Sequence, residues 1–179
     1  SALIKNFLKF CPNVEEICSF GSLPLSNKDL DIVFLPKLTS LYHSYNTNCH
    51  SNYMNVLSLK FAKTLKSIDV SSWLSAPKLT RILTYITRFE SLLKLELDLD
   101  LFSDSILEID EYIARIGQKC AKLKKFRLII GEYCQTSEDF FNVFTHYKSL
   151  IDLNVIFVSN QLVLNGSVKC LKHCKQLKK

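Results

Sequence analysis

The sequence is poor in the residues that make tight turns and phosphate-binding loops, because its 179 residues include only four glycines and four prolines. That scarcity argues against a many-turned β-sandwich and against a glycine-rich nucleotide-binding loop. No apolar run approaches the roughly 18 residues that a membrane-spanning helix needs, and no secretory signal opens the chain. Hydrophobic residues at 47% and charged residues at 22% match globular averages. We expect a folded chain with no membrane partner.

Sequence motifs of catalysis are also missing. The four histidines are scattered, and the chain contains no His-Glu-x-x-His, Walker or Gly-x-Ser-x-Gly pattern. The most metal-like group is Cys170, His173 and Cys174, whose spacing would share one helix face, but a structural zinc site needs a fourth ligand. We therefore expect no enzyme activity, no metal and no cofactor.

The cysteines indicate the cellular compartment of the protein, and the basic residues suggest nucleic acid as an alternative partner. Seven cysteines, an odd number without obvious pairing, fit a reducing compartment, so we expect a cytoplasmic or nuclear protein. The net charge of +6 is local: residues 115–127 carry six Lys or Arg and no acid, and residues 169–179 carry five. These segments could contact nucleic-acid phosphates. Most of their lysines are expected at helix ends and turns, where cations complement the helix dipole, so a solvated surface is favoured over a nucleic-acid site.

The chain repeats itself. A motif in which an aliphatic residue is followed three positions later by another apolar residue begins at residues 14, 38, 65, 92, 123, 150 and 177, in steps of 24, 27, 27, 31, 27 and 27. Three residues before each start stands a residue suited to burial, and three of the seven cysteines occupy this column. The pairs are Val14/Ile17, Leu38/Leu41, Leu65/Ile68, Leu92/Leu95, Leu123/Phe126 and Leu150/Leu153.

Each repeat is predicted to open with a strand and continue into a helix. Apolar residues alternate after the starts, as in Leu95-Leu97-Leu99, which is typical of a half-buried strand. Helical stripes then appear within 26–37, 76–89, 106–120 and 136–147, and residues 2–10 suggest a further helix. Ser75 could cap the second stripe, and Thr136 or Ser137 could cap the fourth.

One strand and one helix cannot bury both of their faces alone, but stacked copies can, with parallel strands on a concave face and helices on a convex face. The predicted fold class is therefore α/β, a leucine-rich repeat solenoid, or horseshoe. The strand segments match the pattern L-x-x-L-x-L, and CAKLKKFRL and CPNVEEI resemble the cysteine-containing repeats of F-box/leucine-rich-repeat proteins. We expect residues 1–179 to form a single array of about six to seven repeats. Neither end reads as a polar cap, so the array is expected to continue in a longer protein.

The concave sheet is the surface that solenoids use for binding. Its residues alternate with the core positions and place an acidic band beside a basic one. Mixed charge with aromatic and aliphatic neighbours favours a protein or peptide partner, whereas the bland alternative is a solvated face without a partner. The predicted partner-binding residues are Tyr42, Asp69, Glu96, Asp98, Lys125, Arg127 and Asn154.

The sequence thus predicts protein recognition by the concave face. The F-box resemblance implies substrate recognition for an SCF-type ubiquitin ligase, in which an F-box outside this chain would dock the cullin-RING adaptor. Two alternatives stay open. One is a non-ligase scaffold or inhibitor in the style of ribonuclease inhibitor, and the other is a nucleic-acid-associated protein that uses the basic segments 115–127 and 169–179.

Overall fold

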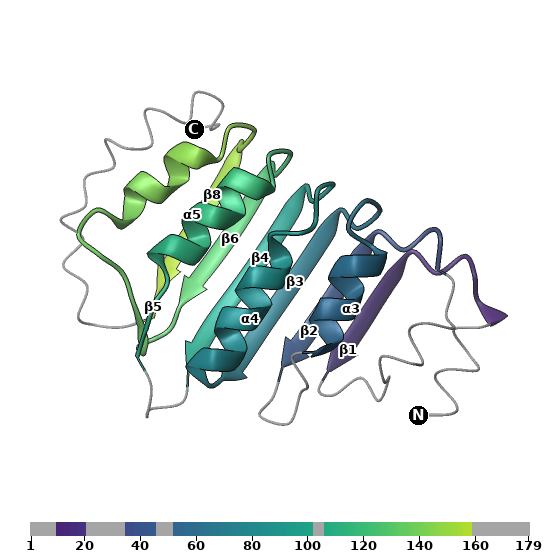
Figure 1. Ribbon diagram of the computed structural model, residues 1–179, viewed down its shortest axis with the longest axis horizontal. Helices are drawn as coiled ribbons and strands as arrows, with labels where there is room; N and C mark the ends of the chain where they lie inside the picture. The colour runs from purple at the N-terminus through teal and green to yellow at the C-terminus, as the bar shows by residue number, and fades with distance from the viewer. Residues whose placement is uncertain (1–9, 21–34, 46–51, 102–105, 159–179) are drawn as a thin grey trace.

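A computed structural model describes residues 10–20, 35–45, 52–101 and 106–158 of the chain. These residues form eight strands and four helices, of which one is a 3-10 helix (Figure 1). The strand at 177, the Cys170 group and the basic segment 169–179 lie outside the described residues, as do the expected helices at 2–10 and 26–37 except for residues 10 and 35–37. The elements are β1 (Glu16–Phe20), β2 (Ser40–Tyr45), α3 (Asn52–Lys60), β3 (Ser67–Leu74), α4 (Ala76–Ile86), β4 (Lys94–Leu101), β5 (Leu107–Glu108), α5 (Asp110–Lys119), β6 (Lys125–Ile130), β7 (Cys134–Gln135), the 3-10 helix η1 (Phe140–His146) and β8 (Asp152–Phe157).

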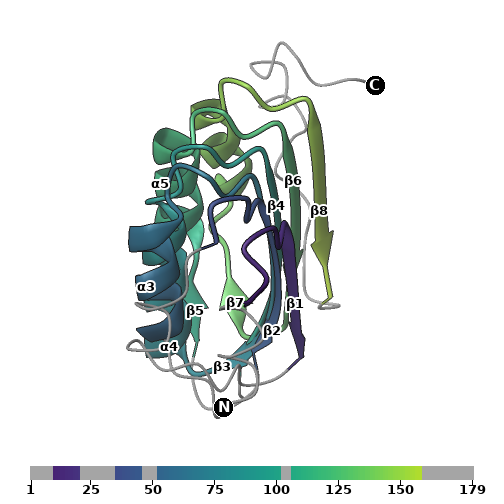
Figure 2. The ribbon, with the colours of Figure 1, turned by 90° about the vertical axis from the view of Figure 1, so that its right-hand side faces the viewer.

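Six strands form one parallel sheet in the order β1-β2-β3-β4-β6-β8. The helices lie on one side of it, so that the molecule has two layers (Figure 2). The strand register is the one that the repeat predicts, because the second apolar residue of each repeat stands opposite its equivalent in the next. This aligned column is Ile17, Leu41, Ile68, Leu95, Phe126 and Leu153. The α/β class with a parallel sheet is confirmed.

A recurring pair of hydrogen bonds joins neighbouring repeats just before each strand. The carbonyl of Thr39 accepts hydrogen bonds from the backbone N–H groups of Lys66 and Ser67, with N–O distances of 2.8 and 3.0 Å. The carbonyl of Lys66 accepts equivalent bonds from Leu93 and Lys94, at 2.8 and 2.9 Å. The next repeat thus supplies hydrogen-bond partners for the backbone carbonyl of each turn. These bonds hold the strands in register, in addition to the hydrogen bonds between the strands themselves.

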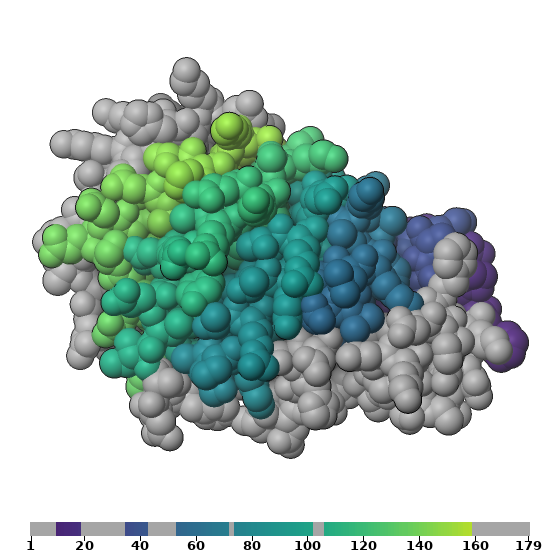
Figure 3. Space-filling view, in the orientation of Figure 1, coloured from purple at the N-terminus to yellow at the C-terminus, as the bar shows by residue number. Residues whose placement is uncertain are grey.

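The core lies between the sheet and the helices. In β4, buried leucines alternate with half-buried polar residues, as expected for a strand with one buried face. The stripe predicted for α4 is confirmed, since Leu79, Ile82, Leu83 and Ile86 are buried. Figure 3 views the molecule from the helix side. In the described residues, no helix is long and apolar enough to cross a membrane.

The sequence pattern does not predict helix α3, because in one of its turns a polar residue is buried and the neighbouring apolar residue is exposed. Ser58 is 1% exposed, whereas the neighbouring Leu59 is 67% exposed. The Ser58 hydroxyl donates a hydrogen bond to the carbonyl of Asn55 at 2.7 Å, which satisfies its buried oxygen. A buried serine beside an exposed leucine erases the apolar stripe that marks a helix in sequence.

The helix predicted within 136–147 is a 3-10 helix rather than an α-helix. Phe140 and Val143, three residues apart, are both buried, and a 3-10 helix places such residues on the same side. The N-caps predicted for this helix, Thr136 or Ser137, are also wrong. Asp139 stands at the N-cap position without a side-chain cap bond, and Ser137 instead donates hydrogen bonds to the Asp110 carboxylate. Ser75 does occupy the N-cap of α4, but its hydroxyl makes no cap bond.

A second sheet of two short strands, which the sequence did not predict, lies on the helix side. Strands β5 and β7 pair in parallel, with Leu107 opposite Cys134. Strand β5 falls in the longest repeat, whose step is 31 residues. Strand β5 thus precedes α5 in the longest repeat, whereas β7 precedes η1 in a repeat whose step is 27 residues.

Candidate functional site

The face of the six-stranded sheet opposite the helices carries the candidate site, and we call it the open face (Figure 2). Its side chains alternate along each strand with those of the core. The residues at open-face positions whose side chains are described are Glu16, Cys18, Ser40, Tyr42, Ser67, Asp69, Ser71, Lys94, Glu96, Asp98, Asp100, Lys125, Arg127, Ile129, Asp152, Asn154 and Ile156.

The structure brings the seven predicted partner-binding residues onto this one face. The strand pairing aligns Tyr42 with Asp69, Asp69 with Glu96, Glu96 with Arg127, and Arg127 with Asn154. The remaining two flank this central row: Asp98 lies two residues after Glu96 on β4, and Lys125 lies two residues before Arg127 on β6. Neighbouring members of the row are about 4.8 Å apart, which is the spacing of paired strands.

Glu96 is the electrostatic centre of the row. Its carboxylate lies 2.6 Å from the ammonium of Lys94 and 3.6 Å from the guanidinium of Arg127. The hydrogen bond to Glu96 is the main reason that the pKa of Lys94 is raised above its ordinary value. The charge of Glu96 is therefore balanced within the face.

Asp69 and Asp98 are in a different situation. Burial is the main cause that raises the pKa of both carboxyls above their ordinary value, and Glu96 raises that of Asp69 further. The Ser71 hydroxyl lies 3.5 Å from the Asp98 carboxylate and donates a hydrogen bond to it. Among the described residues, no cation lies within 4.0 Å of the Asp69 carboxylate. Lys94 and Arg127 act on Asp69 from a greater distance and offset part of this increase in its pKa.

These carboxylates line a hollow in the open face of about 230 Å³. Lys94, Ser71, Ile129 and Asp100 also belong to the face but were not among the predicted site residues. Strand alternation already assigns Ser71, Lys94 and Ile129 to the predicted concave face, and the same rule extends to Asp100, because each stands an even number of residues from a chosen one. The residues that line the hollow are Asp69, Ser71, Glu96, Leu97, Asp98, Arg127 and Ile129.

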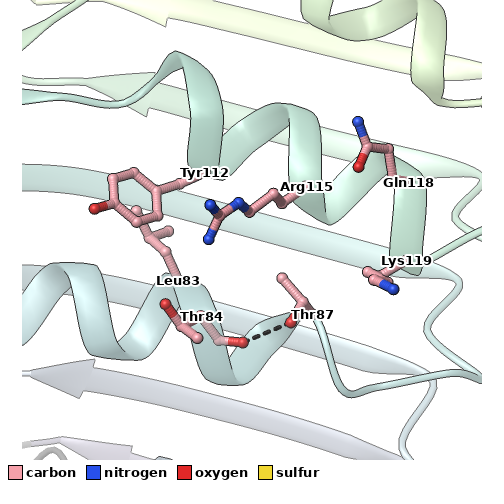
Figure 4. Close-up of a pocket in the computed structure, with 7 residues that line it drawn as sticks. All are labelled: Leu83, Thr84, Thr87, Tyr112, Arg115, Gln118 and Lys119. Atoms are coloured by element: carbon pink, nitrogen blue, oxygen red, sulfur yellow. Dashed lines mark hydrogen bonds between the residues drawn. The ribbon is translucent and has the colours of Figure 1, made fainter.

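The basic segment 115–127 does not form one surface. Arg115 and Lys119 line a groove of about 340 Å³ between α4 and α5, on the helix side (Figure 4). The Arg115 guanidinium also pairs with Glu111 on its own helix. Lys125 and Arg127, in contrast, stand on the open face. A continuous phosphate-binding stripe, as the nucleic-acid alternative would use, is therefore not formed by this segment.

The cysteines of the described residues are free thiols. Cys120, from the repeated cysteine column, is 2% exposed and burial raises its pKa to about 12, so it is a core residue. Cys134 is also buried, with a pKa raised to about 12. No group of His, Cys, Asp and Glu in the described part of the chain could hold a metal ion.

No protein-family model matches this sequence. A search of the curated proteins found no significant match either.

Proposed function

We propose that this chain forms a leucine-rich repeat solenoid that recognises a protein partner through the open face. The observation that supports this most directly is the central row, in which Tyr42, Asp69, Glu96, Arg127 and Asn154 come from five successive strands of one sheet. A repeat of about 27 residues, with equivalent turns and equivalent register, is what such a solenoid requires.

The chemistry of the open face supports a protein partner over a phosphate backbone. Acidic residues on β3 and β4 stand next to basic residues on β6, and Ile129 and Ile156 add apolar surface at its edge. Alternating charge selects a partner with the complementary arrangement, whereas nucleic-acid binding needs positive charge throughout. A folded domain or an extended peptide fits this requirement.

The test is a charge reversal on the open face with a matched control. The triple variant Asp69→Lys, Glu96→Lys and Asp98→Lys reverses three negative charges of the open face. The control variant Glu90→Lys, Glu132→Lys and Glu138→Lys makes the same change of net charge at exposed positions that lie outside the open-face strands. Both are expressed in the source cells, and circular dichroism confirms that each is folded.

Partner capture is then compared by quantitative mass spectrometry. We expect the proteins captured by the wild type to fall about tenfold or more with the open-face variant and to persist with the control. The basis is that close charge pairs across interfaces contribute about 1.5 kcal/mol or more, and about 1.4 kcal/mol is a factor of ten. If the open-face variant captures its partners as well as the wild type does, the open face is not the binding surface.

The F-box resemblance supports a more specific role, substrate recognition for a cullin-RING ubiquitin ligase. In that role the array would hold a substrate and the ligase would supply the catalysis. Co-purification of the full-length protein with a cullin and its F-box adaptor would support this role. Stable partners without those two proteins would instead support the non-ligase scaffold or inhibitor.

A further inference from the structure

We propose that the open face binds an extended segment of its partner in which a Lys or Arg stands three residues away from an Asp or Glu. The cation would enter the hollow beside Asp69 and Asp98, and the acid would lie over Lys125 and Arg127. This inference rests on the proposed function, since it names the kind of partner that the same surface takes.

The first argument is the division of charge across the open face. On β3 and β4, the outward side chains include the acids Asp69, Glu96, Asp98 and Asp100 and only one base, Lys94. On the next strand, β6, the outward charges are both positive. The acidic excess occurs in a chain whose formal net charge is +6, so it is opposite in sign to the molecule as a whole. A partner with a single sign of charge would be repelled by one half of this surface.

The second argument is how far the charges are already paired on the acidic half of the open face, formed by β3 and β4, and on the basic half, formed by β6. Glu96 already contacts both Lys94 and Arg127, so the excess negative charge remains at the hollow, where Asp69 has no cation within 4.0 Å among the described residues. A partner cation placed there would replace the solvation that burial removes from the carboxylates. On the other half, Lys125 is exposed and stands opposite Asp152 of β8, but among the described residues it has no ion pair within 4.0 Å, so it can pair with a partner acid.

The third argument is space. The hollow of about 230 Å³ is several times the roughly 30 Å³ that one water molecule occupies in the liquid. Its walls include Ile129 as well as the carboxylates. A long side chain suits such a site, because the aliphatic stem of Lys or Arg can lie on the apolar wall while the charged end reaches Asp69 and Asp98.

The spacing of the two charges follows from the sheet. Asp69 and Arg127 stand in one row, two strands apart. Two strand spacings of about 4.8 Å give about 10 Å. In an extended segment of polyproline II conformation, three residues make one turn at about 3.1 Å each, so side chains three residues apart face the same side at about 9 Å. A segment that crosses the strands therefore matches both halves when its opposite charges are three residues apart.

The experiment uses three fluorescein-labelled synthetic peptides and the full chain. The first has Lys-Thr-Val-Glu at the centre of twelve residues otherwise made of Ser and Thr. The second has the same composition with Lys and Glu adjacent, and the third has Gln in place of Lys. Binding is measured by fluorescence anisotropy at low ionic strength, where charge pairs are least screened.

We expect the first peptide to bind about tenfold or more tightly than the other two. Asp69→Asn, which removes the charge and keeps the shape, should weaken the first peptide to the level of the others, while the control Glu138→Gln should not. The inference is overturned if the three peptides bind alike, if none binds, or if Asp69→Asn has no effect. In those cases the proposed function stands or falls separately, because the charge-reversal capture experiment tests the open face without assuming any partner sequence.

Discussion

Gly117 lies inside α5 at a point where the ring of Tyr147 leaves no room for a side chain. A Cβ atom at this position would stand 2.4 Å from Cε2 and 2.5 Å from Cδ2 of Tyr147. The ring cannot move aside easily, because it stacks on Phe126 with centroids 5.4 Å apart, and its hydroxyl donates a 2.6 Å hydrogen bond to the carbonyl of Ile113. The substitution Gly117→Ala therefore forces either the ring or the helix to shift.

Three terms, one stabilising and two destabilising, set the size of the effect on the free energy of unfolding. Replacing glycine by alanine inside a helix would by itself stabilise the fold by about 1 kcal/mol. Overpacking a core costs about 1 to 3 kcal/mol. Losing the tyrosine hydrogen bond costs about 1 kcal/mol more. We expect a net destabilisation of about 1 to 3 kcal/mol, the opposite of what helix propensity alone predicts.

Urea unfolding followed by circular dichroism measures the free energy of unfolding. The control is Gln118→Ala, at an exposed position of the same helix, which should change that free energy by less than about 0.5 kcal/mol. In a double-mutant cycle with Tyr147→Leu, the penalty of Gly117→Ala should largely disappear, because the leucine side chain leaves the space free. A Gly117→Ala protein as stable as the wild type, or an additive cycle, would refute the reasoning.

Three further predictions follow from burial and charge. Because burial raises the pKa of Asp69 above 3.8, the folded chain holds this proton more tightly than the unfolded chain, and ionisation costs stability at neutral pH. Asp69→Asn should therefore raise the urea midpoint at pH 7, and the gain should shrink as the pH falls through the raised pKa toward 3.8; a gain independent of pH would contradict this. Iodoacetamide should alkylate the exposed Cys18 of the folded protein within minutes, whereas Cys120 should react only after unfolding, as peptide mass spectrometry can establish. In α3, Met54→Ala should cost about 2 to 5 kcal/mol and Leu59→Ser less than about 0.5 kcal/mol in urea unfolding, because Met54 is 0% and Leu59 67% exposed; equal effects would show that α3 does not pack as described.

The open face could be predicted from sequence because two short-range regularities determine it. Alternation along a strand assigns each residue to one face, and a recurring repeat of about 27 residues places equivalent residues side by side. Together they predicted that Tyr42, Asp69, Glu96, Arg127 and Asn154 form one row, which the strand pairing confirms. Where the local pattern was inverted, as at Ser58 and Leu59, the same reasoning missed a helix.

The sequence did not predict which charges are paired, because pairing depends on the distances between side chains in three dimensions. Sequence placed Glu96 and Asp69 in the same acidic band, but only the structure shows that Glu96 contacts two cations while Asp69 lines a hollow. Sequence also treated 115–127 as one basic segment, although it passes from a helix through a turn to a strand and its charges point to opposite sides of the molecule.

The sequence by itself determined the parallel sheet, its register and the residues that share its open face, because these follow from the alternation within each strand and from the spacing between repeats. Tertiary structure alone decided the 3-10 form of η1, the tight contact of Gly117 with Tyr147 and the balance of charge around Asp69. Gly117 and Tyr147 are 30 residues apart in the chain. Contacts of this kind depend on how neighbouring repeats pack at the level of single ångströms, which no local pattern of residues encodes.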